Sequence, residues 1–250
     1  MKNRIKMTFK PISLLVLLAG ITISSSASSQ DILGLAGYTG NTDQSHYGYV
    51  GLIAPLPVGQ NTSGSLGNDG VLLRLWGAWL AYDYKSGAPS NTNIDVDGPI
   101  GEVGLGYHFV RDFAVSSVYV SYVGRSLDDS PNDPFNNSVD DHSGVKFQGD
   151  TTFDLSDQFG VNLNGSYTAI LDDYWVRGRL YYKYNDTINI GPEITGLGGD
   201  KYHRVKFGAF ISGIQLGGLS LGLQAGADRD TRDDTTDAYF GISLVHLFKY

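Results

Sequence analysis

The sequence predicts an all-β protein: a single closed antiparallel transmembrane β-barrel of about 12 strands, preceded by a cleaved signal peptide. Three observations carry this prediction. After residue 31, apolar and polar residues alternate in runs of nine to fifteen residues, and no helical period competes with them. Short connections tend to alternate with longer polar ones, as in outer-membrane barrels. The sequence stops within the last such run, on the aromatic residue Tyr250.

Composition narrows the class of protein before any motif is considered. The 250 residues include 33 glycines, 16 tyrosines and no cysteine, a balance that favours strands over helices. Without cysteine there is no disulfide framework, no thiolate zinc site and no lipid-anchoring cysteine. The net charge of −8 argues against a nucleic-acid partner, which would require a basic surface.

The first 27 residues read as a secretory signal peptide. A basic start precedes an apolar run over residues 11–23, and small residues follow, with cleavage expected after Ala27 and Ser29 as the alternative. The run is shorter than the roughly 20 apolar residues that a spanning helix needs. Cleavage would remove four cations and no acid, so the net charge would fall to −12. The domains are therefore expected to be a signal peptide at 1–27 and a barrel at 31–250. The cations removed are Lys2, Arg4, Lys6 and Lys10.

Twelve runs in residues 31–250 have the alternation of strands. Their length, greater than the roughly 5–6 residues usual in soluble sheets, suits tilted strands that cross a bilayer. The expected strands are Ile32–Gly40, His46–Leu56, Gly70–Tyr84, Pro99–Phe109, Phe113–Val123, Gly144–Leu155, Phe159–Ile170, Tyr174–Tyr184, Ile188–Gly196, Tyr202–Gln215, Leu219–Asp228 and Ala238–Tyr250.

Alternation alone does not say which face points inward. The connections favour an outer-membrane barrel with both termini at the periplasmic end, because three long polar loops, Lys85–Gly98, Gly124–Ser143 and Arg229–Asp237, share the opposite end. Two connections depart from this rule: Pro57–Asp69 is long on the short-turn side, and Leu171–Asp173 is short on the loop side.

Aromatic residues on the apolar face gather at the expected periplasmic strand ends, which is typical of the aromatic girdle of a membrane barrel. Aromatic preference for strands in general is the alternative explanation. The girdle residues are Tyr107, Phe109, Phe153, Phe159, Tyr182, Tyr184, Phe248 and Tyr250. The terminal aromatic strand also resembles the signal read by the outer-membrane insertion machinery, an expected partner along with outer-membrane lipid.

If the apolar face meets lipid, the charged residues on the other face line the lumen. Glu193 would then lie between strands that carry Arg177 and Arg179 on one side and Arg204 and Lys206 on the other, forming an ion-pair ladder. Such a network either fills and stiffens the interior or provides a polar track for sugar hydroxyls or an ion. The candidate track residues are Arg74, Glu102, Lys146, Asp150, Arg177, Arg179, Glu193, Arg204 and Lys206.

Catalytic, cofactor and metal motifs are weak. The five histidines have no metal-ligand spacing, and Gly196–Gly199 precedes no helix that could hold a phosphate. The acidic stretch 228–237 lacks the fixed spacing of a calcium loop, so a solvated outer loop is the simpler interpretation. We expect a non-enzymatic protein without cofactor or metal.

The second half resembles the bacterial cellulose biosynthesis protein family BcsS. The residues that carry the resemblance are the segments 191–196 (GPEITG), 202–210 (YHRVKFGAF), 219–228 (LSLGLQAGAD) and 238–241 (AYFG). The resemblance covers roughly residues 31–250, with a looser match in the first half. It implies a barrel of the outer membrane or cell envelope linked to cellulose production or export, and it supplies no catalytic residue.

The expected protein is therefore a barrel of the Gram-negative outer membrane with a structural or conduit role in exopolysaccharide secretion. Cellulose secretion components or the polysaccharide itself are the expected partners. Three alternatives stay open: a small general porin, an outer-membrane hydrolase acting on lipid A, which needs a Ser–His pair on the outward rim, and a soluble lipocalin-like binder.

Overall fold

The protein folds as a barrel of strands whose neighbours are all antiparallel. The computed structural model describes residues 31–59, 64–86, 92–133, 139–169, 171–199, 202–232 and 234–250. The expected signal peptide at residues 1–27 lies outside these described residues. The strands are β1 (Asp31–Asn41), β2 (His46–Pro55), β3 (Gly70–Lys85), β4 (Asn93–Arg111), β5 (Ala114–Arg125), β6 (Asp128–Ser130), β7 (His142–Asp154), β8 (Phe159–Thr168), β9 (Asp173–Lys183), β10 (Asn189–Gly199), β11 (Tyr202–Leu216), β12 (Leu219–Asp230) and β13 (Thr235–Lys249).

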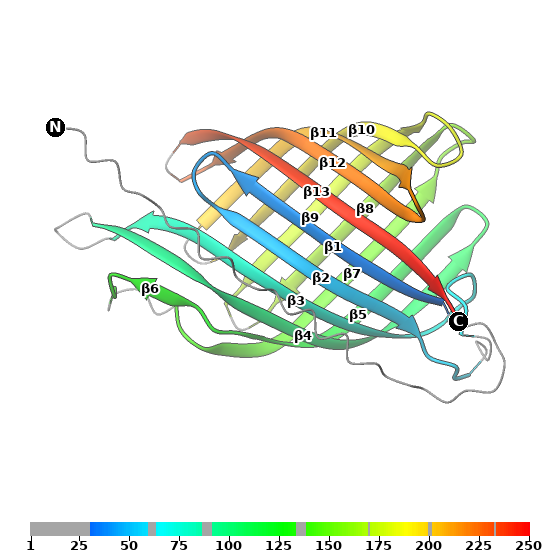
Figure 1. Cartoon of the computed structure of the whole chain (residues 1–250), viewed down its shortest axis with the longest axis horizontal. Coiled ribbons are helices and arrows are strands. Elements are labelled where there is room, and N and C mark those ends of the chain that lie inside the picture. The colour runs from blue at the N-terminus through cyan, green and yellow to red at the C-terminus, as the bar shows by residue number, and fades with distance from the viewer. Residues whose placement is uncertain are drawn as a thin grey trace.

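Twelve strands close the barrel, as the sequence predicted, and β6 is a short addition. The order runs β3-β2-β1-β13-β12-β11-β10-β9-β8-β7-β5-β4, and the pairing of β3 with β4 closes the ring (Figure 1). Closure pairs the first barrel strand with the last over the whole length of β1, from Asp31 opposite Lys249 to Asn41 opposite Tyr239. Within the described residues, each of the twelve barrel strands therefore pairs with two neighbours, as a lipid-facing sheet requires.

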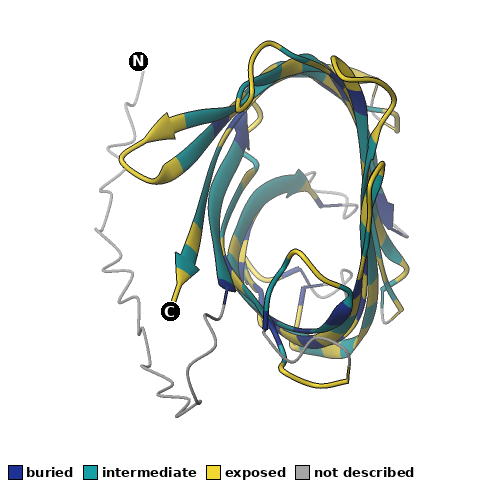
Figure 2. Ribbon diagram, turned by 90° about the vertical axis from the view of Figure 1, so that its right-hand side faces the viewer, coloured by how far each residue is buried: buried dark blue, intermediate teal, exposed yellow. Residues whose placement is uncertain are grey.

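In this barrel the apolar face of the strands is exposed and the polar face is buried, which is the reverse of a soluble sheet protein. Large apolar side chains are exposed on the outside, among them Leu105 at 57% and Phe207 at 64%. Charged side chains are buried on the inside, including Arg74 and Glu193. Figure 2 shows this ring of strands from the end that carries the C-terminus. The apolar face therefore points outward, as expected for strands that contact lipid.

The end of the barrel at which β1 begins and β13 ends, called the termini end below, carries the expected aromatic girdle. Tyr107 and Phe109 have ring centroids 4.7 Å apart, and Phe159 lies 5.4 Å from Tyr182 across the β8–β9 pair. Further round the ring, Phe248 stacks on Tyr250 at 6.4 Å. Amphipathic rings at one level of the outer face are the arrangement that places tyrosines at a lipid headgroup layer.

The contrast between short turns and long loops is weaker than the sequence predicted. Strand β4 begins at Asn93 rather than Pro99, because residues 93–98 continue the ladder with residues 80–85 of β3. Likewise, β12 ends at Asp230 and β13 begins at Thr235, so the long loop expected at 229–237 is short. The connection between β5 and β7 is the long one at this end, and β6 within it pairs with residues 95–97 of β4.

The lumen face is also less uniformly polar than expected. At the end opposite the termini, Ile94 and Val96 of β4 point inward and are almost fully buried by Leu127 and Val139 from the β5–β7 connection. This connection therefore packs its apolar residues against the inner face of the barrel rim.

One irregularity shapes the termini end of β11. The register of the β11–β12 pair shifts between Ile211 and Ile214, as in a β-bulge. Gly213 within the shift has a φ of 84°, and a Cβ there would lie 1.6 Å from the carbonyl oxygen of Thr187. Glycine is required at this position for both reasons.

Candidate functional site in the barrel lumen

The candidate track residues form separate charge clusters on the inner wall. The first, the Glu102 cluster, joins β3, β4 and β7. Arg74 Nε donates to Glu102 Oε1 at 2.8 Å, and Lys146 Nζ donates to Oε2 at the same distance. The Arg74 guanidinium also lies 4.2 Å from the centroid of Trp76. Both carboxylate oxygens therefore have a cation, and an aromatic ring supports one of these cations.

The second cluster surrounds Glu193 on the opposite side of the ring, in β10. Arg179 from β9 contacts Glu193 Oε2 at 2.7 Å, while the Tyr239 hydroxyl of β13 donates to Oε1, also at 2.7 Å. Arg179 further donates to Gln224 Oε1 at 2.5 Å and lies 4.3 Å from the ring of Phe210. Glu193 is thus held from both sides of its strand.

Two glycines make the long reach of Tyr239 possible. Tyr239, Gly226, Gly208 and Glu193 are direct register partners along β13, β12, β11 and β10. A Cβ at Gly208 would lie 2.4 Å from the Tyr239 hydroxyl oxygen, and one at Gly226 would lie 2.8 Å from the ring. The ring therefore crosses two strands because neither presents a side chain to the lumen at this row.

The third cluster centres on Asp228 of β12, which is fully buried. Arg204 Nε contacts its Oδ1 at 3.1 Å, Lys206 Nζ contacts Oδ2 at 3.4 Å, and Asn41 Nδ2 donates to Oδ2 at 3.1 Å. Arg204 also lies 3.5 Å from Asp237. The acidic stretch that was interpreted as a solvated loop thus begins inside the barrel, and its first carboxylate is an inward ion-pair partner.

The predicted ladder of four cations around Glu193 is therefore wrong in detail. Of the four, Arg179 alone contacts Glu193, since Arg204 and Lys206 bind Asp228. Arg177 makes no ion pair within the described residues. Asp150 of β7 lies opposite Asn164 of β8 and makes no ion pair within the described residues. The alternation of the sequence correctly predicted that these residues lie on the inner face. Alternation does not show which cation pairs with which carboxylate.

The clusters have a clear physical consequence for the wall. Removing one partner of a buried ion pair costs about 3–5 kcal/mol, because it leaves an uncompensated charge. Partnered on every oxygen, the carboxylates Glu102, Glu193 and Asp228 hold neighbouring strands in one arrangement. Chemically, these fixed donors and acceptors can replace water around hydroxyl or charged groups of a solute.

Carboxylates outside the spanning strands mark the two ends. In the β1–β2 turn, partial burial raises the pKa of Asp43, and the nearby carboxylates of Asp237 and Asp83 add to this effect. At the termini end, the N–H of Val110 and the guanidinium of Arg111 hold the pKa of Asp69 below its ordinary value.

The Pro57–Asp69 connection is anchored at the termini end. Asp31 accepts hydrogen bonds from the Ser65 hydroxyl and the Leu66 N–H, and His108 Nε2 donates to the Leu66 carbonyl oxygen at 3.0 Å. His108 Nδ1 in turn accepts from Ser117 at 2.8 Å. This Ser–His pair faces the lumen, so it does not supply the outward-facing pair that a lipid A hydrolase needs.

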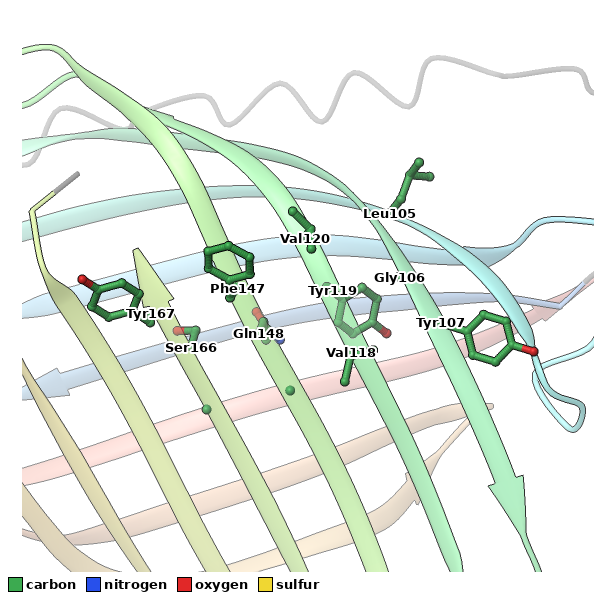
Figure 3. Close-up of a pocket in the computed structure, with 12 residues that line it drawn as sticks. Leu105, Gly106, Tyr107, Val118, Tyr119, Val120, Phe147, Gln148, Ser166 and Tyr167 are labelled. Carbon is green, nitrogen blue, oxygen red and sulfur yellow. The ribbon is translucent and has the colours of Figure 1, made fainter. Parts of the chain in front are cut away.

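One hollow lies outside the lumen. It measures 780 Å³ and lies on the outside of β4, β5, β7 and β8, where Gly149 and Gly165 leave space between Phe147, Tyr167 and Val118 (Figure 3). Its position among lipid-facing side chains separates it from the charge clusters. Among the described residues, no group of three metal-ligating side chains occurs, and no helix is long and apolar enough to cross a membrane.

Several wall residues were missed by the analysis of charge alone. Tyr239, Asn41, Trp76 and Phe210 all contact the clusters, yet none is charged. Alternation could have found Tyr239, because it occupies the face opposite Phe240 and Ile242 in β13. Nothing in the sequence signals that its ring crosses two strands.

A closed antiparallel barrel with an apolar outside and an ion-paired inside belongs to the class of transmembrane β-barrels. Within that class, the chain is a member of the cellulose biosynthesis protein BcsS family, whose model matches residues 36–248. A comparison with curated proteins found no match.

Solved structures agree on the fold. An outer membrane channel from Pseudomonas putida F1 is 11% identical, with a TM-score of 0.59 over 90% of this chain and 97% of its own. A TodX deltaS2S3 mutant monoaromatic hydrocarbon channel is 10% identical, with a TM-score of 0.53 over 90% of this chain and 91% of its own. Both neighbours are channels, and the architecture is consistent with an outer-membrane location.

Proposed function

We propose that the protein is a non-enzymatic outer-membrane barrel that supports the secretion or assembly of cellulose or a related exopolysaccharide. It would do so either as a conduit or as a docking component for secretion partners. The observation that carries the proposal is a closed barrel with a polar, ion-paired inner wall in a chain of the BcsS family. Polar groups fixed on such a wall can exchange hydrogen bonds with sugar hydroxyls.

Cellulose yield tests this proposal directly. A deletion strain is expected to secrete less cellulose, and the unaltered gene is expected to restore the yield. Complementation with Leu163→Arg, which places a charge on the exposed outer face, is expected to fail because the barrel does not insert. Complementation with Arg229→Gln, at an exposed loop-end pair, serves as the matched control and is expected to succeed. Unchanged yield in the deletion strain would refute the proposal.

A small general channel is the second candidate, and the channel-like neighbours favour it. Conductance measurements in planar bilayers, combined with cellulose yield, distinguish the two candidate functions. Conductance of simple ions in purified barrels, together with normal cellulose yield in the deletion strain, would favour the general channel over the proposed role.

A further inference from the structure

One cation on the inner wall differs from all the others. Among the Arg and Lys residues of the described chain that are not exposed, Arg177 alone has no carboxylate within 4.0 Å. The other seven each have one, at 2.7 to 3.4 Å. These seven are Arg74, Arg125, Lys146, Arg179, Lys183, Arg204 and Lys206.

The surroundings of Arg177 leave its donors free. Its register partners on the adjacent strands are Asn164 and Thr195, both neutral. Its Nε is buried and has no hydrogen-bond partner among the described residues. The guanidinium lies 5.3 Å from the centroid of Trp175 on its own strand. A buried charge without a partner is costly, so it is retained where a partner arrives from outside.

Charged and phenolic groups on several strands act on this position. Arg179 and Glu193 lie beside it, Asp150 lies on β7 beyond Asn164, and Tyr49 lies on β2, directly across the ring. Arg179 and Glu193 neutralise each other at 2.7 Å, and Asp150, on the strand beyond Asn164, makes no ion pair with Arg177 among the described residues. Among these described groups, the donor left without a partner is therefore on a cation, Arg177.

We infer that Arg177 anchors a site in the lumen for an oxyanion, the carboxylate or phosphate group of a solute or saccharide. The planar guanidinium presents paired donors that match the two oxygens of such a group, and the ring of Trp175 supports its orientation. The inference rests on the proposed function, in which solutes reach the lumen, and deepens it by naming the chemical class that the lumen takes.

Binding by the purified full chain in detergent tests the inference. At constant ionic strength, sodium glucuronate or phosphate is expected to raise the thermal midpoint, whereas glucose is not. Glucuronate and phosphate distinguish a carboxylate-bearing saccharide from a phosphate group. Arg177→Gln is expected to weaken this binding at least tenfold, and Arg229→Gln, at an exposed loop-end pair, is expected to leave it unchanged. Equal binding by Arg177→Gln and the unaltered chain would overturn the inference, as would no binding of either anion.

A second measurement separates a binding role from a structural one. In buffer without oxyanions, Arg177→Gln is expected to keep or raise the thermal midpoint, because it removes an unpaired buried charge. Arg179→Gln, two residues along the same face, is expected to lower the midpoint, because it leaves Glu193 without its cation. If Arg177→Gln lowers the midpoint as much as Arg179→Gln does, Arg177 is structural and the inference fails. These binding measurements do not depend on cellulose yield, so failure of the proposed function would be seen separately.

Discussion

The outer and inner faces of β9 differ in what their side chains require, because one face is turned toward lipid and the other toward the lumen. Val176 and Leu180 point outward and are each about half exposed, at 50% and 48%, while Arg177 and Arg179 point inward from the intervening positions. The outer residues need no specific partner, because lipid accepts any apolar shape. The inner residues depend on particular partners, because an unpaired charge away from bulk water is costly. Substitutions are therefore expected to act by different rules on the two faces.

The largest effect is expected at the Glu102 cluster. Glu102→Gln removes the carboxylate that holds both Arg74 and Lys146, so it leaves two buried cations unpaired. We expect a loss of about 3–5 kcal/mol in the free energy of unfolding. Urea titration of the barrel refolded into lipid vesicles measures this loss. A change below the error of that titration would mean that the cluster does not stabilise the wall.

The next effect compares adjacent residues of β8. Leu163 is exposed on the outer face, whereas Asn164 lies on the inner face between Asp150 and Arg177. A charge near the bilayer midplane costs about 2–4 kcal/mol on the lipid side, so Leu163→Arg should block insertion. Asn164→Arg should be tolerated. Heat-modified migration on gels after outer-membrane fractionation reports insertion, and equal insertion of both variants would contradict the assignment of the faces.

A smaller effect is expected from two glycines on opposite faces. Gly208→Ala would place a Cβ 2.3 Å from the Ala225 carbonyl oxygen and 2.4 Å from the Tyr239 hydroxyl, and overpacking of this kind costs about 1–3 kcal/mol. Gly149→Ala on the outer face meets no atom within 4 Å and should be close to neutral. The same urea titration measures both variants. Similar losses from the two would show that the close contacts at Gly208 do not control the effect.

The smallest effect is expected at an ion pair in water. Arg229 and Asp234 contact each other at the loop end of the barrel, with side chains 60% and 78% exposed. Exposed pairs contribute about 0–1 kcal/mol, so Arg229→Gln should barely alter the unfolding midpoint. A loss as large as that of Glu102→Gln would show that burial is not what gives the inner pairs their strength.

The fold was predictable because its signal is repeated in every strand. Alternation placed the twelve barrel strands and grouped the residues that share a face, while the connections and the aromatic girdle predicted which face points outward. Errors arose at the end of the barrel opposite the termini, where β4, β12 and β13 extend beyond their predicted bounds. Residues 93–98 form a ladder with β3 although their composition, with Asp95 and Asp97, is typical of a loop. Pairing with β3, and with β6 over residues 95–97, extends the strand here.

The candidate site was predictable as a set of inward residues but not as contacts. Arg179, Arg204 and Lys206 all lie on the inner face as expected, yet their carboxylates are divided between Glu193 and Asp228. This division depends on strand register and on the reach of side chains such as Tyr239 across glycines. Both are tertiary properties, and a single sequence read by periodicity does not contain them.

The bond between the Tyr239 hydroxyl and Glu193 links strands that are three places apart in the ring. Because an antiparallel strand slips in steps of two residues if its faces are to be kept, a slip of β10, β11, β12 or β13 would carry the hydroxyl and carboxylate several ångströms apart. A single contact therefore checks the alignment of four consecutive strands at once. A barrel with misaligned strands would keep its apolar outer face but lose this hydrogen bond. The buried Glu193 carboxylate would then have a partner on one oxygen only, so the correct alignment is favoured.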